Sequence, residues 1–379
     1  MRSCWSDPEP KEDDGKKYIK QYELGRTLGK GSYAKVKLCY DIEQAREEFA
    51  MKIFNTSLLK RRRTWSSSEG YTTAFDDVLR EIAIMRKISH EHVVALRDVI
   101  DDSHINKLYM VMTYCSRGAL MDSQKLPCEP LPFELARKWF ADSVLGLDYL
   151  HFQDIVHFDL KPDNILITDN GRALIADFGV SRTILDGTRA SGSPGTPSYT
   201  APEVWGTDKY EAKKSDIWSL GATLHAMVFG TLPYLCTDQQ QLIDMVTAPE
   251  EWKCTQQAHA DDADFVDLLR AMLRKQPKER ASLDAIKAHP WLDSELEERV
   301  TAPLDRIEVD EEEIRSAVIT GHVESFRRTP EGRLLKTTWR QEGDMYMAMS
   351  QSRMRSFLPT VHDFKESLGG RVIIEMDDL

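Results

Sequence analysis

The stretch HFDLKPDN at residues 157–164, followed by DFG at residues 177–179, decides the fold of this chain. It brings the acids Asp159 and Asp177 together with Lys161 and Asn164 in a short span of sequence. Carboxylate and amide oxygens are the ligands that a small hard cation such as Mg²⁺ requires, and a lysine can hold a phosphate oxygen. Any one of these residues in a loop would usually be a turn former. All of them in this order predict a site for phosphoryl transfer.

These motifs resemble the catalytic loop and the metal-binding loop of eukaryotic protein kinases. The resemblance implies a bilobal α+β fold, with a small antiparallel β-rich lobe that carries one regulatory helix and a larger helical lobe. It implies that Asp159 accepts the proton of the acceptor hydroxyl or orients that hydroxyl, and that Lys161 contacts the transferred phosphate. Asn164 and Asp177 would hold Mg²⁺. Phe158 departs from the family, which usually has Arg there.

A glycine-containing stretch, LGKGSYAKV at residues 28–36, lies between two strand patterns. Glycines let backbone amides approach phosphates without an intervening Cβ, although two glycines at this spacing also occur in ordinary turns. Lys52 on the next strand matches in kind the lysine that binds the α- and β-phosphates in kinases.

Glu81 lies on the helical pattern that follows and is the expected counter-charge for this lysine. Asp76 and Asp77 lie on the same pattern, so the choice of Glu81 rests on the resemblance, and a surface glutamate is the alternative.

The run LYMVM at residues 108–112 has the pattern of a buried strand. By resemblance it leads into the hinge that binds adenine, and a plain core strand is the alternative for each of its residues. The residues expected to bind ATP are Leu28, Gly29, Gly31, Val36, Ala50, Lys52, Glu81, Met112, Tyr114, Cys115 and Asp177.

The acceptor is expected to be Ser or Thr, because by resemblance Lys two residues after the catalytic Asp marks serine/threonine kinases. The stretch GTPSYTAPE at residues 195–203 agrees with this expectation. Thr200 is assigned to the position that contacts Asp159 and Lys161 in those kinases.

Three further residues have expected structural roles. Glu203 needs a buried partner, because an isolated carboxylate inside the protein is costly, and Arg280 matches the family's choice. Asp216 is expected on a helix that supports the catalytic loop.

Phe158 bears on regulation. The usual Arg pairs with a phosphate on the activation segment, and Phe158 cannot form this pair. We therefore hypothesise activity that is controlled without phosphorylation of that segment. The alternative is a degraded site in a catalytically silent, kinase-like scaffold.

Residues 78–85, 193–197 and 308–318 resemble the calcium/calmodulin-dependent protein kinase kinases and related upstream activators of AMP-activated protein kinase. This implies that the protein substrate is the activation segment of another kinase. Unrelated protein substrates are the alternative. The insert between Lys52 and Glu81 is shorter than in the calmodulin-dependent members.

Calmodulin is a candidate partner through residues 333–358, which combine apolar anchors with basic residues. The residues 342–344, Glu-Gly-Asp, interrupt this pattern, and a packing or autoinhibitory tail is the alternative.

The composition suits a globular protein with two lobes and an extension, at 379 residues, 41% hydrophobic and 30% charged. A net charge of -12 argues against nucleic acid as a partner. No apolar run has the length of a membrane span, and six scattered cysteines suit a reducing compartment. A cytoplasmic or nuclear location is expected.

The expected organisation starts with a disordered leader at 1–21. A kinase domain follows at 22–292, with lobes at 22–113 and 114–292, and 293–379 is a regulatory or packing extension. The basic and serine-rich residues 60–70 are expected to be a solvated loop.

Overall fold

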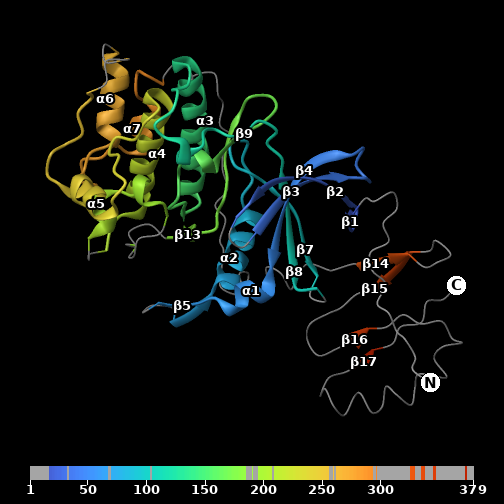
Figure 1. Ribbon diagram of the computed structural model, residues 1–379. Coiled ribbons are helices and arrows are strands. Elements are labelled where there is room, and N and C mark those ends of the chain that lie inside the picture. The colour runs from blue at the N-terminus through green and yellow to red at the C-terminus, as the bar shows by residue number, and fades with distance from the viewer. Residues whose placement is uncertain are drawn as a thin grey trace, which may run out of the picture. The chain divides into compact units, whose positions relative to one another are not determined.

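The computed structural model describes residues 17–31, 34–66, 70–102, 105–184, 190, 195–206, 209–255, 259, 262–292 and 296, with four short strands beyond residue 320. The described residues divide into two compact units (Figure 1). The first contains the chain up to Ile82 together with Leu96–Thr113. The second contains Ala83–Ala95 and the chain from Tyr114 to Leu292.

A six-stranded antiparallel sheet forms the first unit, in the order β1-β2-β3-β4-β8-β7. Successive residues of a strand point to opposite faces, and apolar side chains of one face pack into a core around Tyr22, Met51 and Val111. The strands are β1 (Lys17–Ile19), β2 (Tyr22–Lys30), β3 (Ala34–Asp41), β4 (Glu47–Asn55), β7 (Leu96–Asp102) and β8 (Lys107–Thr113).

Two expectations about this unit are wrong, the first of them in part. Strand β1 lies at the end of the leader expected to be disordered, and it is ordered because it pairs with β2 while Ile19 packs against the core. Residues 1–16 of that leader lie outside the described residues. The expected solvated loop at 60–70 instead begins in the helix α1 (Thr56–Arg61) and contains most of a hairpin, β5 (Arg63–Ser66) and β6 (Gly70–Thr73). Asn55 caps α1 by accepting a hydrogen bond from the backbone N–H of Leu58.

Helix α2 (Ala74–Lys87) follows the hairpin and continues from the first unit into the second. Its N-terminus is a reciprocal cap, since Asp76 accepts from the Thr73 backbone at 2.6 Å and Thr73 accepts from the Asp76 backbone at 3.4 Å. Val78 and Ile82 are buried on one face, which fixes the rotation of the helix and leaves Glu81 pointing into the protein.

The second unit is mainly helical (Figure 1). Helix α4 is buried over nearly its whole length and lies at the centre of the packing, in contact with α3 and α6. The helices are α3 (Phe133–Phe152), α4 (Ala212–Phe229), α5 (Gln239–Thr247), α6 (Ala263–Met272) and α7 (Leu283–Lys287).

Short strands and single helical turns in this unit carry the motif residues. Strands β9 (Gly118–Ala119), β11 (Ile165–Ile167) and β12 (Ala173–Ile175) form one sheet, and β10 (Ile155–Val156) pairs with β13 (Arg182–Thr183). The 3-10 turns are η1 (Ser123–Lys125), η2 (Pro162–Asn164), η3 (Pro197–Tyr199) and η4 (Pro202–Trp205).

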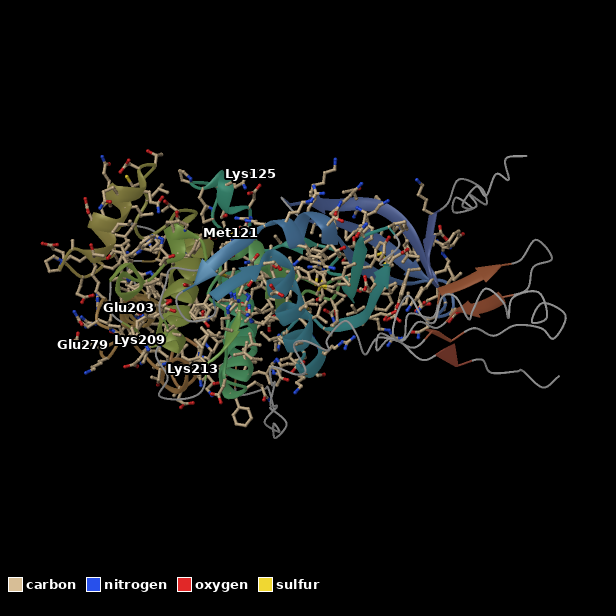
Figure 2. The ribbon with its side chains drawn as sticks, turned by 90° about the horizontal axis from the view of Figure 1, so that it is seen from below. Met121, Lys125, Glu203, Lys209, Lys213 and Glu279 are labelled. Atoms are coloured by element: carbon tan, nitrogen blue, oxygen red, sulfur yellow. The ribbon has the colours of Figure 1, made fainter. Side chains whose placement is uncertain are left out.

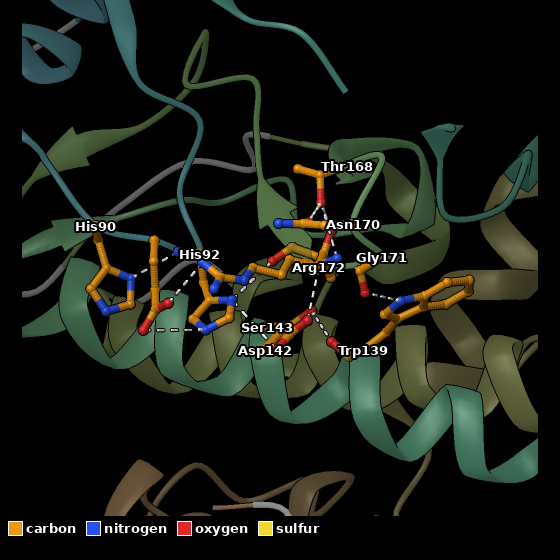
Figure 3. Close-up of polar contacts among 11 residues, drawn as sticks. His90, His92, Trp139, Asp142, Ser143, Thr168, Asn170, Gly171 and Arg172 are labelled. Carbon is orange, nitrogen blue, oxygen red and sulfur yellow. Dashed lines mark hydrogen bonds and ion pairs between the residues drawn. The ribbon is translucent and has the colours of Figure 1, made fainter. Parts of the chain in front are cut away.

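The loop after α2 is tied to α3 and β12 by histidines (Figure 3). His92 Nδ1 donates to the Ala173 carbonyl at 3.2 Å, and Asp142 on α3 accepts from the Ala173 N–H at 2.8 Å. The His90 ring stacks on Tyr149 with centroids 4.8 Å apart. These contacts fix the start of β12, the strand that leads into residues 177–179.

Beyond residue 320 the described segments are strands. Strand β14 (Ser325–Arg328) pairs with β15 (Leu334–Thr337), and β16 (Met345–Tyr346) pairs with β17 (Val372–Ile373). Residues 333–358, the candidate calmodulin segment, therefore contain strand rather than helix at β15 and β16. None of the helices within the described ranges has the length and apolarity to cross a bilayer.

Candidate active site

One face of the sheet in the first unit gathers the residues that the sequence predicted for ATP. Gly29 lies opposite Val36, and Val36 lies opposite Lys52. Ala50, two residues before Lys52 on β4, lies opposite Met112. Directly opposed residues share a face and alternate residues return to it, so all five lie on the face away from the core around Met51.

The other two residues predicted for ATP in this stretch, Leu28 and Gly31, lie where the backbone departs from regular strand pairing. The pairing of β2 with β3 shifts register between Thr27 and Gly29, so Leu28 lies at a bulge that can re-aim its side chain. The Gly31 N–H donates to the Ala34 carbonyl at 2.8 Å and closes the turn. A Cβ built at Gly29 would meet no atom within 4 Å, so open space lies on that side of the strand.

Lys52 and Glu81 form the ion pair that the sequence predicted. Lys52 Nζ lies 2.7 Å from Glu81 Oε1, and the Glu81 side chain is only 3% exposed. The two acids nearby are engaged elsewhere, since Asp76 caps α2 and Asp77 pairs with Arg80 at 3.0 Å. A buried carboxylate beside Lys52 holds the ammonium charged and fixed in place.

The expected adenine-binding residues lie where the first unit ends. Met112 lies near the end of β8, and Tyr114 and Cys115 begin the return of the chain to the second unit. Cys115 is buried, and burial together with the charge of Asp169 raises its thiol pKa to about 12. This cysteine is therefore a neutral, apolar group rather than a nucleophile.

Asp216 on α4 holds the backbone of the catalytic loop in the second unit. Its Oδ2 accepts from the His157 N–H at 2.9 Å, and its Oδ1 accepts from the Phe158 N–H at 2.8 Å. His151 Nε2 also lies 2.9 Å from Oδ2. Asp216 is fully buried, so the donors around its carboxylate offset the cost of burying the charge. Sequence analysis identified Asp216 and missed His151.

The carboxylate of Asp159 lies at the centre of a polar network. Its Oδ2 accepts from Lys161 Nζ at 2.7 Å and from Asn164 Nδ2 at 3.0 Å. Its Oδ1 accepts from the Thr196 hydroxyl at 2.7 Å. A carboxylate has about four lone-pair sites. Three of them have donors in the described part of the chain, and the fourth, on Oδ1, has none there.

Thr196 holds the position that the sequence analysis assigned to Thr200, and that assignment is wrong. Thr196 Oγ1 accepts from Lys161 Nζ at 2.6 Å and donates to Asp159. Thr200 Oγ1 instead donates to the Thr196 carbonyl at 3.0 Å. Thr196 immediately precedes the 3-10 turn η3, which carries the chain away from the site before Thr200 is reached. Counting from the Gly-Thr-Pro triplet rather than from Ala-Pro-Glu would have found it.

The two predicted metal ligands are joined through the backbone. The Ala176 N–H donates to the Asn164 carbonyl at 2.8 Å, and Asp177 follows Ala176 directly. Asp177 has φ +65°, a left-handed conformation that turns the chain after β12. Asn164 donates through Nδ2, and its Oδ1 has no hydrogen bond among the residues described.

The donor set suits a phosphate-bound Mg²⁺. Among the described residues no group of three or more His, Cys, Asp and Glu side chains could hold a metal by itself. Mg²⁺ is commonly held by one or two protein oxygens, with phosphate and water supplying the rest. Asn164 and Asp177 fit that arrangement, because one offers an amide oxygen and the other a carboxylate.

Phe158 belongs to the catalytic loop, and its backbone faces Gly195 in the activation segment. Its φ is +67°, and a Cβ at residue 195 would overlap its carbonyl oxygen. Gly195, with φ +95°, is therefore required for the close approach of the two segments. This packing joins the catalytic loop to residue 195 through backbone contact.

Glu203 and Arg280 form the buried pair that the sequence predicted, with Arg280 Nη1 and Nη2 donating at 2.6 and 2.9 Å. Figure 2 shows Glu203 in the same part of the second unit as Glu279, the neighbour of Arg280. The Arg280 guanidinium also lies 5.2 Å from the centroid of the Trp218 ring. A bidentate pair of this kind fixes the end of the activation segment to α4 and the chain beyond it.

The sequence matches the protein kinase domain family over residues 22–292. This chain belongs to the protein kinase family. The catalytic loop, the ion pair and the α+β architecture are those that the motifs predicted.

Similar proteins include several named kinases. The chain is 36% identical over 75% of its length to serine/threonine-protein kinase GRIK1 of Arabidopsis thaliana. It is 33% identical over 79% of its length to a calcium/calmodulin-dependent protein kinase kinase of Caenorhabditis elegans. It is 32% identical over 80% of its length to SNF1-activating kinase 1 of Saccharomyces cerevisiae. The matched regions cover 69%, 58% and 30% of these relatives, so this kinase domain spans only part of the longer ones.

Proposed function

We propose that this protein is an ATP-dependent serine/threonine protein kinase. The observation that carries the proposal is the network of Asp159, Lys161 and Thr196, which leaves one carboxylate lone pair for an acceptor hydroxyl. Bound ATP with Mg²⁺ supplies the γ-phosphoryl group and its charge compensation.

Each residue then has a physical role in transfer. Asp159 orients the acceptor hydroxyl and takes its proton, and Lys161 stabilises negative charge on the transferred group. Asn164 and Asp177 offer the oxygens for Mg²⁺, and Lys52, held by Glu81, binds phosphate. Thr196 holds Asp159 and Lys161 in register, so the carboxylate does not rotate away.

Substitution of the catalytic acid tests the proposal. Asp159→Asn keeps the size of the side chain and removes the base, and we expect transfer from radiolabelled ATP to a protein acceptor to fall at least about 100-fold. The matched control is Asp163→Asn, an acid on the same loop outside the Asp159 network. If the wild-type protein binds nucleotide but transfers no phosphate, it is a catalytically silent scaffold and not an enzyme.

We also propose that the substrate is the activation segment of another kinase. Two relatives carry names of kinases that act on kinases, and the chain aligns with both over most of its length. The test is phosphorylation of a catalytically inactive AMP-activated-type kinase domain, read by mass spectrometry. Modification confined to residues outside its activation segment would refute this assignment.

The hypothesis of activity without activation-segment phosphorylation is tested at the serines of that segment, without Thr196. Thr196 contacts Asp159, so its substitution would damage the site whether or not it is ever phosphorylated. The test set is therefore Ser191→Ala, Ser193→Ala and Ser198→Ala together, of which the first two lie outside the described residues. We expect kcat to stay within about twofold, because Phe158 offers no cation for a phosphate. A loss comparable to that of Asp159→Asn in a folded protein would refute it.

Calmodulin is a candidate regulator because of the apolar and basic residues at 333–358 and because of the name of one relative. Strands at β15 and β16 interrupt the helix that calmodulin would bind, so we expect no calcium-dependent gel shift with a 330–360 peptide. A calcium-dependent shift would restore calmodulin as a regulator. We also propose a cytoplasmic or nuclear location, tested by fractionation of cells, since six scattered cysteines suit a reducing compartment.

A further inference from the structure

Lysines gather on the face of the first unit's sheet that is turned away from the residues expected to bind ATP. Lys30 on β2 lies directly opposite Lys35 on β3, and Lys37 is two residues further along β3. Lys37 lies opposite Met51, whose side chain packs in the core of that face. Directly opposed residues share a face and alternate residues return to it. These three lysines therefore lie on the same face as Met51.

Lys17 on β1 is a fourth lysine of this face. It lies opposite Leu24 on β2, and Leu24 lies opposite Cys39 on β3, two residues beyond Lys37. Burial lowers the pKa of the Lys37 ammonium, and the like charges of Lys35 and Lys17 lower this pKa further, so the groups are close enough to repel one another. The lysine cluster, as we call it, consists of Lys17, Lys30, Lys35 and Lys37.

The positive charge of the lysine cluster is not compensated by the described part of the chain. None of its four ammonium groups forms an ion pair with a carboxylate there. Lys17, Lys30 and Lys35 are exposed, and Lys37 is half-buried. Like charges that lie directly opposite each other destabilise a pair of antiparallel strands. An anionic partner on this face would remove that repulsion as well as add an attraction.

The chain itself carries a segment of complementary charge. Residues 307–314 have the sequence IEVDEEEI, in which five acids are combined with three apolar residues. Apolar groups would also find partners on this face, because the partly buried Ile19, Leu24 and Ile53 pack around its core. We call residues 307–314 the acidic segment, and it lies outside the described residues.

The course of the chain also favours the acidic segment over other acidic runs. Strands β14 to β17 follow it and belong to the same compact unit as the sheet. The acids at 295–298 instead continue directly from the second unit, since the Leu296 N–H donates to the Leu292 carbonyl at 3.2 Å. The acidic segment therefore lies where the chain returns to the unit that carries the lysine cluster.

We propose that the acidic segment docks on the lysine cluster and holds the C-terminal extension against the back of the sheet that carries the expected ATP residues. Lys35 and Lys37 flank Val36, which lies on the opposite face of β3, across from Lys52. A docked segment would therefore fix the strand that presents Val36 to the nucleotide. Because most of these charges are exposed, the contact weakens as salt screens them.

Carbodiimide cross-linking of the full chain tests the proposal, because this reagent joins a lysine amine to a carboxylate through an amide bond only where the two groups touch. We expect mass spectrometry of the monomer to find links between the lysine cluster and the acids of the acidic segment. These links should be lost at about 1 M salt, where the Debye length is about 3 Å.

Neutral variants test which charges hold the segment. Lys30→Gln/Lys35→Gln should lower the yield of the remaining links about fivefold, as for the loss of two exposed ion pairs. Lys60→Gln/Arg61→Gln is the matched control, since it removes two exposed charges from α1 and should leave the yield unchanged. Exchange of charge, by Lys30→Glu/Lys35→Glu together with Glu311→Lys/Glu312→Lys, should restore the links.

Four results would overturn the proposal. Links to acids outside the acidic segment would assign a different occupant, and links between isotopically distinct copies would assign the lysine cluster to a second copy of the chain. An absence of links from the cluster would show that nothing is docked there. A rise in Tm for Lys30→Gln/Lys35→Gln, where docking predicts a fall, would show that the opposed lysines only repel each other. None of these measurements depends on phosphate transfer, so the proposed kinase function stands or fails separately.

Discussion

Removal of the Thr196 hydroxyl gives the most direct test of the site. Thr196→Val keeps the shape of the side chain and removes two hydrogen bonds to charged groups, one at 2.6 Å with Lys161 and one at 2.7 Å with Asp159. A hydrogen bond to a charged group contributes about 1.5–3 kcal/mol, and bonds within one network are not additive. A combined loss of about 2–3 kcal/mol corresponds to a fall in kcat of about 30- to 150-fold.

Thr200→Val is the comparison variant. It removes one hydrogen bond between neutral groups, from the hydroxyl to the Thr196 carbonyl at 3.0 Å. Such a bond contributes about 0.5–1.5 kcal/mol, so kcat should fall by about tenfold at most. The assay is steady-state transfer to a peptide, with thermal unfolding as the folding control and Thr196→Ser as the variant that retains the hydroxyl. A larger loss for Thr200→Val than for Thr196→Val would refute the reassignment.

Three other outcomes follow from buried groups. Arg280→Met should lower the free energy of unfolding by about 3–5 kcal/mol in urea titration, because it leaves the Glu203 carboxylate buried without its partner. Arg280→Lys keeps a positive charge and should lower this free energy by less. Burial lowers the pKa of His225 from 6.5 to about 4, so the unfolded chain takes up a proton that the folded chain does not. The free energy of unfolding therefore decreases as pH falls from about 6.5 to about 4. Between pH 7 and pH 5, His225→Gln should lose about 2 kcal/mol less of this free energy than the wild type. The same pH dependence in both proteins would contradict this. Glu81→Gln should lower kcat/KM for ATP at least about tenfold by removing the counter-charge of Lys52. Asp77→Asn, which weakens the part-buried pair with Arg80 on the same helix, should not.

Much of the architecture followed from local pattern. The strand patterns on either side of residues 28–36 and the buried run at 108–112 predicted strands, and the structure has β2, β3 and β8 there. The helical pattern that carries Glu81 is α2. These elements are set by which face of a short segment is apolar, and that property is visible along the chain.

The errors have a common physical cause. Strand β1 has only three residues, too few for a sequence pattern, and is ordered by its pairing with β2 and by the packing of Ile19. The insert after Lys52 is charged and rich in serine, and it forms α1 and a hairpin through a side-chain cap and backbone pairing. The composition of a segment indicates how much apolar area it can bury. It does not indicate which strand or side chain will form hydrogen bonds with its backbone.

The amino-acid sequence by itself determined the chemical groups of this protein and their order, because phosphoryl transfer requires an acid, a lysine and oxygen ligands whatever their arrangement. Only the tertiary structure decided which threonine bridges Asp159 and Lys161, and which of three acids pairs with Lys52. Residues four or five positions apart look equivalent along the chain. A 3-10 turn after Thr196 and a capping bond at Asp76 make them different, since hydrogen bonds and ion pairs depend on distances of about 3 Å that folding alone sets.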